Sequence, residues 1–162
     1  MQANYFVRTL MALFLTLTTV NAGAENWPDG TKIDSWFANT SKVDVNTLGK
    51  QYVITDYGVS TDSTIVQTAA IQAVIDKASE NGGGVIVIPR GTFITGSLFF
   101  KPKTHLHLVE GAKLKGSDRI TNFKILETRI EGETCPYFAA VINADHVDGF
   151  TITGKGTTDG NG

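Results

Sequence analysis

The chain has 162 residues, enough for a single domain, and its composition of 41% hydrophobic and 19% charged residues is typical of a folded globular protein. Its formal net charge of −2 argues against a nucleic-acid partner, because nucleic-acid binding requires a basic face. The single cysteine, Cys135, excludes an internal disulfide, and we interpret it as a small apolar filler rather than a reactive thiol.

Residues 1–24 have the features of a secretory signal peptide. Arg8 is the only charged residue among them, an apolar stretch covers residues 10–20, and Ala22-Gly23-Ala24 provides an A-x-A cleavage motif. A short membrane anchor is the alternative, but the apolar stretch is short and rich in threonine. We therefore expect cleavage after this motif and export to the periplasm or the extracellular space, with no membrane attachment of the mature chain.

The mature chain is expected to begin with a polar leader over residues 25–50, followed by a folded domain over residues 51–162. In the leader, Trp27-Pro28-Asp29-Gly30 predicts a turn. Trp36 is expected to pack against the domain, and stacking of its indole on a sugar ring is the alternative.

An amphipathic helix is predicted after a β-rich run at 52–55. Thr64 and Gln67 fit a capping box, in which the hydroxyl and the carboxamide each satisfy a free backbone amide. Apolar residues then recur at helical spacing: Val66, Ala70, Ile71, Val74, Ile75 and Ala78. The run Asn81-Gly82-Gly83-Gly84 ends the helix, because these residues adopt positive φ at low cost. These glycines follow a helix instead of preceding one, which argues against nucleotide binding.

Three later segments superimpose on one another and predict a repeating architecture. They are Val85–Gly96, His105–Gly116 and Gly149–Gly160, each a short strand, a glycine-containing bend and a second short strand. The aligned sets are Ile86, Leu106 and Phe150; Ile88, Leu108 and Ile152; Gly91 and Gly111; and Ile94, Leu114 and Thr158. One unit cannot bury its apolar face alone, so equivalent residues are expected to form ladders between stacked coils.

The fold class predicted from this pattern is all-β, a parallel β-helix with the helix capping its N-terminal coil. A β-sandwich would not require glycines in register from unit to unit, and an α/β domain would require a second helix. The last visible coil would present open strand edges, so we expect a β-helix that is incomplete at its C-terminus.

The histidines predict no metal site. His105 and His107 share one strand face and make a conceivable two-histidine half-site. Leu106 and Leu108 occupy the core face of that strand, so a solvated outer face is the preferred interpretation. His146 lies in a polar turn without a partner motif. We expect no metal and no cofactor.

Two polar residues are candidates for a role at a sugar site. Asp159 could serve as a catalytic acid, but a hydrogen bond to backbone amides in a turn is the preferred interpretation. Residues 117–137 interrupt the repeat and form a long excursion, where binding residues often lie. Arg129 in this excursion is the candidate substrate-binding residue, because a guanidinium can bind a uronate carboxylate through two hydrogen bonds. Pairing with Glu127, Glu131 or Glu133 is the alternative.

The order of motifs resembles the opening of pectin-active β-helix proteins. The motifs are Asp56-Tyr57-Gly58-Val59, Ala70-Ile71-Gln72, Gly82-Gly83-Gly84 and Ile88-Pro89-Arg90-Gly91-Thr92-Phe93. Three further segments narrow the resemblance to glycoside hydrolase family 28, the polygalacturonases, in particular its Bacteroidetes-type members: Leu106 to Ala112, Thr128 to Cys135 and Gly154 to Gly162. The resemblance covers nearly all of the mature chain and implies a right-handed, pectin-lyase-like solenoid.

The resemblance also implies a function, hydrolysis of α-1,4-galacturonosyl bonds with inversion, and a galacturonan substrate. Family catalysis rests on Asn-Thr-Asp, Asp-Asp, Gly-His-Gly and Arg-Ile-Lys motifs, none of which occurs here. No catalytic residue is therefore assigned, and we expect this chain to be an inactive N-terminal portion of such an enzyme. The alternatives are a non-catalytic carbohydrate-binding or tailspike-like β-helix and a pectate-lyase-like enzyme.

Overall fold

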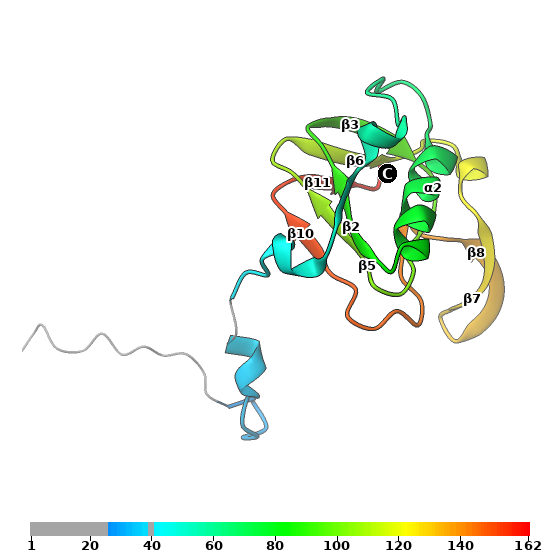
Figure 1. Cartoon of the computed structure of the whole chain (residues 1–162). Coiled ribbons are helices and arrows are strands. Elements are labelled where there is room, and N and C mark those ends of the chain that lie inside the picture. The colour runs from blue at the N-terminus through cyan, green and yellow to red at the C-terminus, as the bar shows by residue number, and fades with distance from the viewer. Residues whose placement is uncertain (1–25, 39–40) are drawn as a thin grey trace, which may run out of the picture. The chain divides into compact units, whose positions relative to one another are not determined.

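The computed structural model describes residues 26–38 and 41–162, which fall into two compact units divided between Lys42 and Val43 (Figure 1). The predicted signal peptide lies outside the described residues, and the division falls within the predicted leader. None of the helices in the described part of the chain is long and apolar enough to cross a membrane.

The first unit is built around three aromatic rings. Gly30 N–H donates to the carbonyl of Trp27 at 2.9 Å, which confirms the predicted turn. The 3₁₀ helix η1 (Ser35–Ala38) carries Trp36 and Phe37, whose rings stack at 3.7 Å between centroids. The ring of Trp27 meets Phe37 edge-on at 5.4 Å. These contacts hold the unit together because aromatic pairs prefer such geometries.

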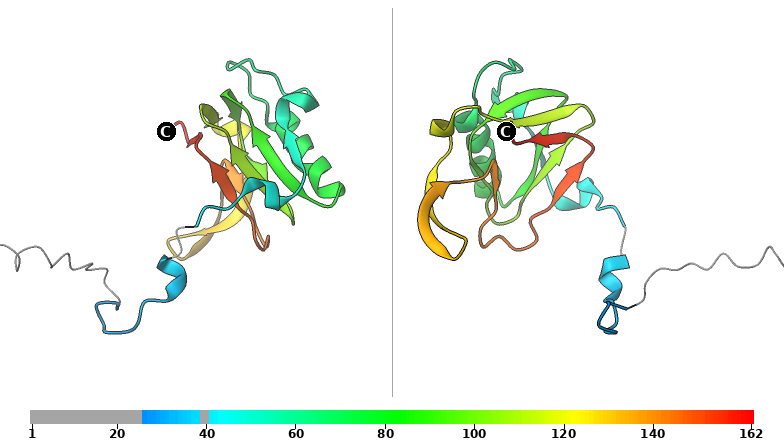
Figure 2. Two further views of the ribbon diagram at one scale, coloured as in Figure 1. Left: turned by 60° about the vertical axis from the view of Figure 1, so that its left-hand side comes forward. Right: turned by 180° about the vertical axis from the view of Figure 1, so that it is seen from behind.

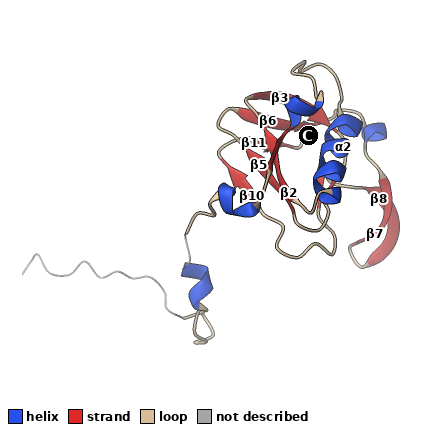
Figure 3. Ribbon diagram, viewed as in Figure 1, coloured by secondary structure: helices blue, strands red, loops and turns tan. Residues whose placement is uncertain are grey.

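The second unit is mostly β (Figure 3), and the strands of three of its four sheets pair in parallel. One sheet has the order β1-β2-β5-β10: Gln51–Val53, Gly84–Ile88, Thr104–Leu108 and Ile152–Gly154. A second sheet has the order β3-β6-β11: Gly91–Thr95, Ala112–Gly116 and Thr157–Asp159. A third pair joins β4 (Leu98–Phe99) to β9 (Ile142–Asn143), again in parallel. The short 3₁₀ helices η2 (Val45–Leu48) and η3 (Ile54–Tyr57) flank β1.

The register of the first sheet confirms two of the predicted ladders. Ile86 lies opposite Leu106 and Ile88 opposite Leu108, and all four side chains are buried. The third unit was misaligned, however. Ile152 pairs with Leu106 and not with Leu108, so Phe150 precedes the strand instead of joining it. The side chain of Ile152 on the outer strand β10 is 52% exposed.

The second sheet departs from the predicted alignment by one residue. Phe93, not Ile94, is the neighbour of Leu114, and Gly91 pairs with Ala112 rather than aligning with Gly111. Thr158 pairs with Leu114 as predicted. Because side chains alternate in a strand, the one-residue shift places Phe93 in the core and directs Ile94 outward.

Unequal bend lengths cause both misalignments. Residues 89–90 separate β2 from β3, whereas residues 109–111 separate β5 from β6. Residues 155–156 separate β10 from β11, and Ala112, the first residue of β6, has no partner in β11. Gly154 allows this close approach, because it has φ +102° and a Cβ on it would lie 1.9 Å from the carbonyl oxygen of Leu108.

The predicted helix is α2 (Thr68–Glu80), which buries Ile71, Val74, Ile75 and Ala78 in the core. It lies against β2, β3, β4 and β5. In the left view of Figure 2, α2 stands at one end of the stack and β10 and β11 at the other. The strand β2 begins at Gly84, the last residue of the glycine run and one residue before the predicted start at Val85.

The predicted capping box is wrong. The N-cap residue of α2 is Gln67, and it makes no side-chain cap. Its carboxamide instead pairs with the backbone of Ser60, accepting from the N–H at 2.6 Å and donating to the carbonyl at 2.8 Å. Thr64 bonds to Asp62, with 2.6 Å between the hydroxyl and the carboxylate. Thr64 and Val66 therefore belong to a loop that precedes the helix.

The excursion after β6 forms a separate antiparallel hairpin. The 3₁₀ helix η4 (Ile120–Asn122) leads into β7 (Ile125–Ile130), which pairs with β8 (Glu133–Phe138). The turn uses Glu131 and Gly132, both with positive φ, as expected for a two-residue hairpin turn. In Figure 1 the hairpin projects from the side of the unit that carries α2.

Candidate functional site

Arg129, the predicted substrate-binding residue, lies on β7 opposite Thr134 with its side chain exposed. The ion pairs among the described residues involve other side chains, so the alternative of pairing with Glu127, Glu131 or Glu133 is not realised. The guanidinium is therefore available to an external carboxylate.

The strand alternation places Arg129 on the same hairpin face as an aromatic ring. Ile125 and Glu127 of β7 share the face of Arg129, and Phe138 lies directly opposite Ile125. The Phe138 ring stacks on that of Tyr137 with 4.3 Å between centroids. Both rings are well exposed, and Phe123 approaches Phe138 at 6.2 Å. A sugar acid has an apolar ring face and a carboxylate. The aromatic rings can contact the ring face, and the Arg129 guanidinium can bind the carboxylate.

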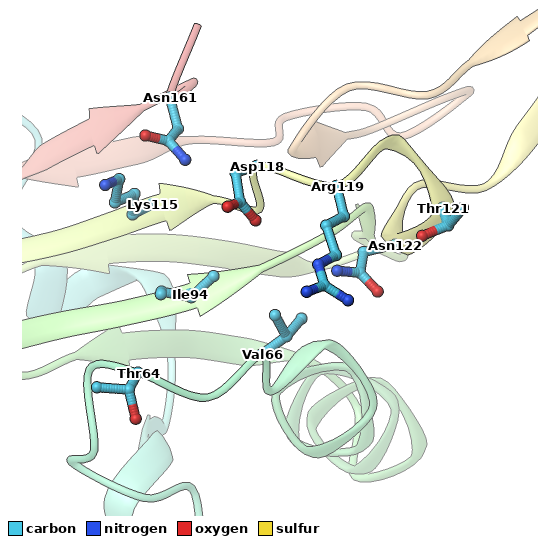
Figure 4. A pocket seen from close by; sticks show the side chains of 9 residues that line it. All are labelled: Thr64, Val66, Ile94, Lys115, Asp118, Arg119, Thr121, Asn122 and Asn161. Carbon is cyan, nitrogen blue, oxygen red and sulfur yellow. The ribbon is translucent and has the colours of Figure 1, made fainter.

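A pocket of about 520 Å³ lies on the outward side of the β3–β6–β11 sheet (Figure 4). It combines strand residues with residues of the loops before α2 and after β6: Thr64, Val66, Ile94, Lys115, Asp118, Arg119, Thr121, Asn122 and Asn161. This site is not predicted from the sequence, because the repeat pattern does not reveal the one-residue shift that turns Ile94 outward, and residues 117–122 carry no recognised motif.

Buried Ser117 fixes the loop after β6. Its Oγ accepts hydrogen bonds from the backbone N–H of Arg119 at 3.1 Å and from Nδ2 of Asn122 at 2.7 Å. The loop also packs tightly on Gly96, where a Cβ would lie 1.8 Å from the carbonyl oxygen of Asn122. Two pocket residues are therefore held in place before any ligand arrives.

The geometry of Asp159 supports its predicted role in a turn. Its Oδ1 accepts the backbone N–H of Asn161 at 2.9 Å, and its Oδ2 lies 3.6 Å from Nζ of Lys113. The hydrogen bond from Asn161 and the nearby charges of Lys113 and Lys115 lower the pKa of this carboxyl below its usual value. A general acid at neutral pH needs a raised pKa, so Asp159 is poorly suited to that task.

The two strand histidines face outward as predicted, but they are half-buried and not fully solvated. Nδ1 of His107 lies 2.8 Å from Oγ1 of Thr153 on the neighbouring strand. Nδ1 of His105 is buried without a partner, and this burial lowers the pKa of its imidazole. No group of three or more potential metal-binding side chains occurs in residues 26–38 and 41–162. His146 is exposed and pairs with Asp145 at 2.7 Å.

Comparisons with known proteins agree with this architecture. Residues 52–143 match the family model "Rhamnogalacturonase A/epimerase, pectate lyase-like". The exo-poly-α-D-galacturonosidase of Dickeya chrysanthemi is 34% identical over 144 residues, which cover 84% of this chain and 23% of that enzyme.

Two solved structures share the fold. The family 28 exopolygalacturonase of Yersinia enterocolitica superimposes with a TM-score of 0.59 at 30% identity, over 70% of this chain and 21% of that one. The hyperthermoactive exopolygalacturonase of Thermotoga maritima gives a TM-score of 0.63 at 24% identity, over 75% of this chain and 26% of that one.

The chain thus spans about a quarter of the length of these relatives. The resemblance to the family 28 polygalacturonases, expected from the sequence motifs, is confirmed. Because the family model covers more than half of its residues, this chain belongs to the rhamnogalacturonase A/epimerase, pectate lyase-like family.

Proposed function

We propose that this chain is the N-terminal portion of a glycoside hydrolase that cleaves galacturonan. The observation that carries the proposal is the 34% identity to an exo-poly-α-D-galacturonosidase over most of the chain. Both solved structures described above are also named exopolygalacturonases. A tailspike-like binding protein and a lyase are correspondingly less favoured.

The role of this portion is to begin a right-handed parallel β-helix with α2 as its N-terminal cap. The parallel registers of β2 with β5 and of β3 with β6, each one coil apart, support this architecture. The buried face of α2 covers apolar side chains that the first coil would otherwise expose. A cap of this kind prevents edge-to-edge aggregation of an open β-stack.

The contact with substrate is assigned to the exposed hairpin face. Arg129 binds the carboxylate of a galacturonosyl residue, and the ring of Phe138 lies against an apolar sugar face. Phe138 pairs with Ile125, four residues along β7 from Arg129, which is about 14 Å at about 3.4 Å per residue, so the two side chains contact different sugars of one chain. Arg129→Gln in the longer enzyme should raise KM for polygalacturonate and leave the solubility of the protein unchanged.

Export by a cleaved signal peptide is part of the same proposal, because an enzyme acting on a polysaccharide must meet it outside the cytoplasm. Mass spectrometry of the secreted product is expected to find Glu25 at its N-terminus. A cytoplasmic product that retains Met1 would contradict it.

The experiment that tests the function compares residues 25–162 with the longer protein that carries the Asn-Thr-Asp and Asp-Asp motifs. Inverting hydrolysis needs two carboxyl functions about 6.5–9.5 Å apart across the bond. We expect reducing-end release from polygalacturonate by the longer protein and none by residues 25–162. Comparable turnover by both would refute the assignment of this chain as a non-catalytic portion.

A further inference from the structure

The pocket on the β3–β6–β11 sheet contains two cationic side chains that lack an ion-pair partner. Lys115 and Arg119 both line it, and neither belongs to an ion pair within 4.0 Å among the described residues. Asp159 is the nearest acid on the strand beside Lys115, but it is paired with Lys113 at 3.6 Å. With Asp118 as the third charged residue, the lining carries two positive charges and one negative charge.

Both cations are attached to well-supported backbone. Lys115 lies on β6, the central strand of its sheet, between Ile94 of β3 and Asp159 of β11. The backbone of Arg119 is held by buried Ser117, which also holds the Asn122 side chain. A site whose supporting residues are already bonded loses less entropy when a ligand binds.

The remaining lining residues match a hydroxylated ring better than a simple anion. Val66 and Ile94 supply an apolar wall, and the amides of Asn122 and Asn161 both donate and accept hydrogen bonds. Figure 4 shows Asp118 between Lys115 and Arg119, where its carboxylate can accept hydrogen bonds from hydroxyl groups. A pocket of about 520 Å³ is also within the usual range for small-molecule sites.

We propose that this pocket binds a hexuronic acid residue, with Arg119 and Lys115 on its carboxylate and Asp118, Asn122 and Asn161 on its hydroxyl groups. The site is separate from the hairpin face of Arg129. The inference rests on the proposed function only for the choice of galacturonate as the acid. The acid can come from a free monosaccharide or from a residue of the polymer, and both sources present the same carboxylate.

The test is calorimetric titration of the full chain with galacturonate, polygalacturonate, galactose and inorganic phosphate. Galactose lacks the carboxylate, and phosphate lacks the ring and the apolar contact. We expect saturable binding of galacturonate that weakens as salt is raised, because charge-assisted contacts at an exposed site are screened. Galactose and phosphate should each bind about tenfold more weakly or worse, since each loses one part of the recognition.

Two arginines of similar exposure provide a matched pair of variants. Arg119→Gln should weaken galacturonate binding about tenfold or more, the usual effect of removing a charged hydrogen-bond donor. Lys115→Gln should act in the same direction. Arg90→Gln, in the bend between β2 and β3 and outside the pocket lining, should leave binding of the monosaccharide unchanged. Circular dichroism of each variant confirms that the chain is folded.

Each outcome decides the proposal. Absence of binding of both galacturonate and polygalacturonate by the folded chain, equal binding of phosphate, or binding that Arg119→Gln does not affect would overturn it. If polygalacturonate binds through this pocket but the monosaccharide does not, the ligand is the polymer. Loss of pocket binding leaves reducing-end release by the longer protein untouched, so failure of this inference and failure of the proposed function are distinguishable.

Discussion

The side chain of Gln72 in α2 satisfies both backbone hydrogen-bonding groups of Phe99 in β4. Its Nε2 donates to the Phe99 carbonyl at 2.9 Å, and the Phe99 N–H donates to its Oε1 at 2.8 Å. The flanking residues Leu98 and Phe100 direct their N–H groups to the opposite edge, where they bond to Val141 and Asn143. Gln72 therefore takes the place of a neighbouring strand on the edge of β4 that faces the helix.

Gln72→Leu should lower the free energy of unfolding by about 1–3 kcal/mol, because it leaves a partly buried N–H and C=O without partners. Urea denaturation monitored by circular dichroism measures the change. Gln51→Leu is the control, since Gln51 is exposed and should change stability by no more than about 0.5 kcal/mol. Equal effects of the two substitutions would show that the pairing with Phe99 contributes nothing.

A second prediction concerns the two faces of β5. Leu108 is 3% exposed and belongs to the core, so Leu108→Ala in the longer protein should cost about 2–5 kcal/mol. His107 faces outward and bonds to Thr153, so His107→Ala should cost about 1 kcal/mol. Thermal and urea unfolding of both variants measure the two losses of stability. A larger loss from His107→Ala would mean that the strand faces are inverted.

The ladders of the first sheet were predictable because alternating apolar residues at Ile86, Ile88, Leu106 and Leu108 have only one way to face a common core. The helix face at Ile71, Val74 and Ile75 was predictable for the same reason, with a different period. In both cases burial of apolar side chains determines the structure, and the spacing of apolar residues in the sequence indicates which side chains are buried.

The bends were not predictable from the same pattern. A bend tolerates one residue more or less at little energetic cost, and the glycines that mark it do not record its length. The sequence therefore does not predict the register shift between β3 and β6. For the same reason it does not predict that Ile94 faces outward into the pocket. The capping box failed at Gln67 because a tertiary contact with Ser60 competed with the local one.

The third prediction concerns Gly154, the last residue of β10. Gly154 and Gly132 both have positive φ. Of the two, only Gly154 lies so close to another backbone atom, the carbonyl oxygen of Leu108, that an added Cβ would collide with it. Gly132→Ala should cost about 1–2 kcal/mol of conformational strain. Gly154→Ala should cost about 1–3 kcal/mol more, since the backbone of β10 must move away from Leu108. Chemical denaturation of both variants provides the comparison, and equal losses would contradict the close approach of β10 to β5.

The last prediction concerns pH. The imidazole of His105 has a lowered pKa because burial disfavours its charged form, and its buried Nδ1 has no partner. The unfolded chain therefore binds a proton at this residue more readily than the folded chain does, and stability rises with pH wherever that difference exists. The stabilisation is complete above the unfolded value of 6.5 and is lost as the pH falls through the lower folded value.

Thermal unfolding of the wild type should accordingly show a falling Tm between about pH 7 and pH 5.5, a range above the titration of ordinary carboxylates. His105→Val removes the titrating group, keeps a strand-forming side chain next to Val85, and should flatten this part of the profile. His146→Gln is the matched control, because His146 is 93% exposed and its replacement should leave the slope unchanged. An unaltered slope in His105→Val, or a slope abolished by His146→Gln, would assign the pH dependence to another group and show that the burial of His105 has no consequence for stability.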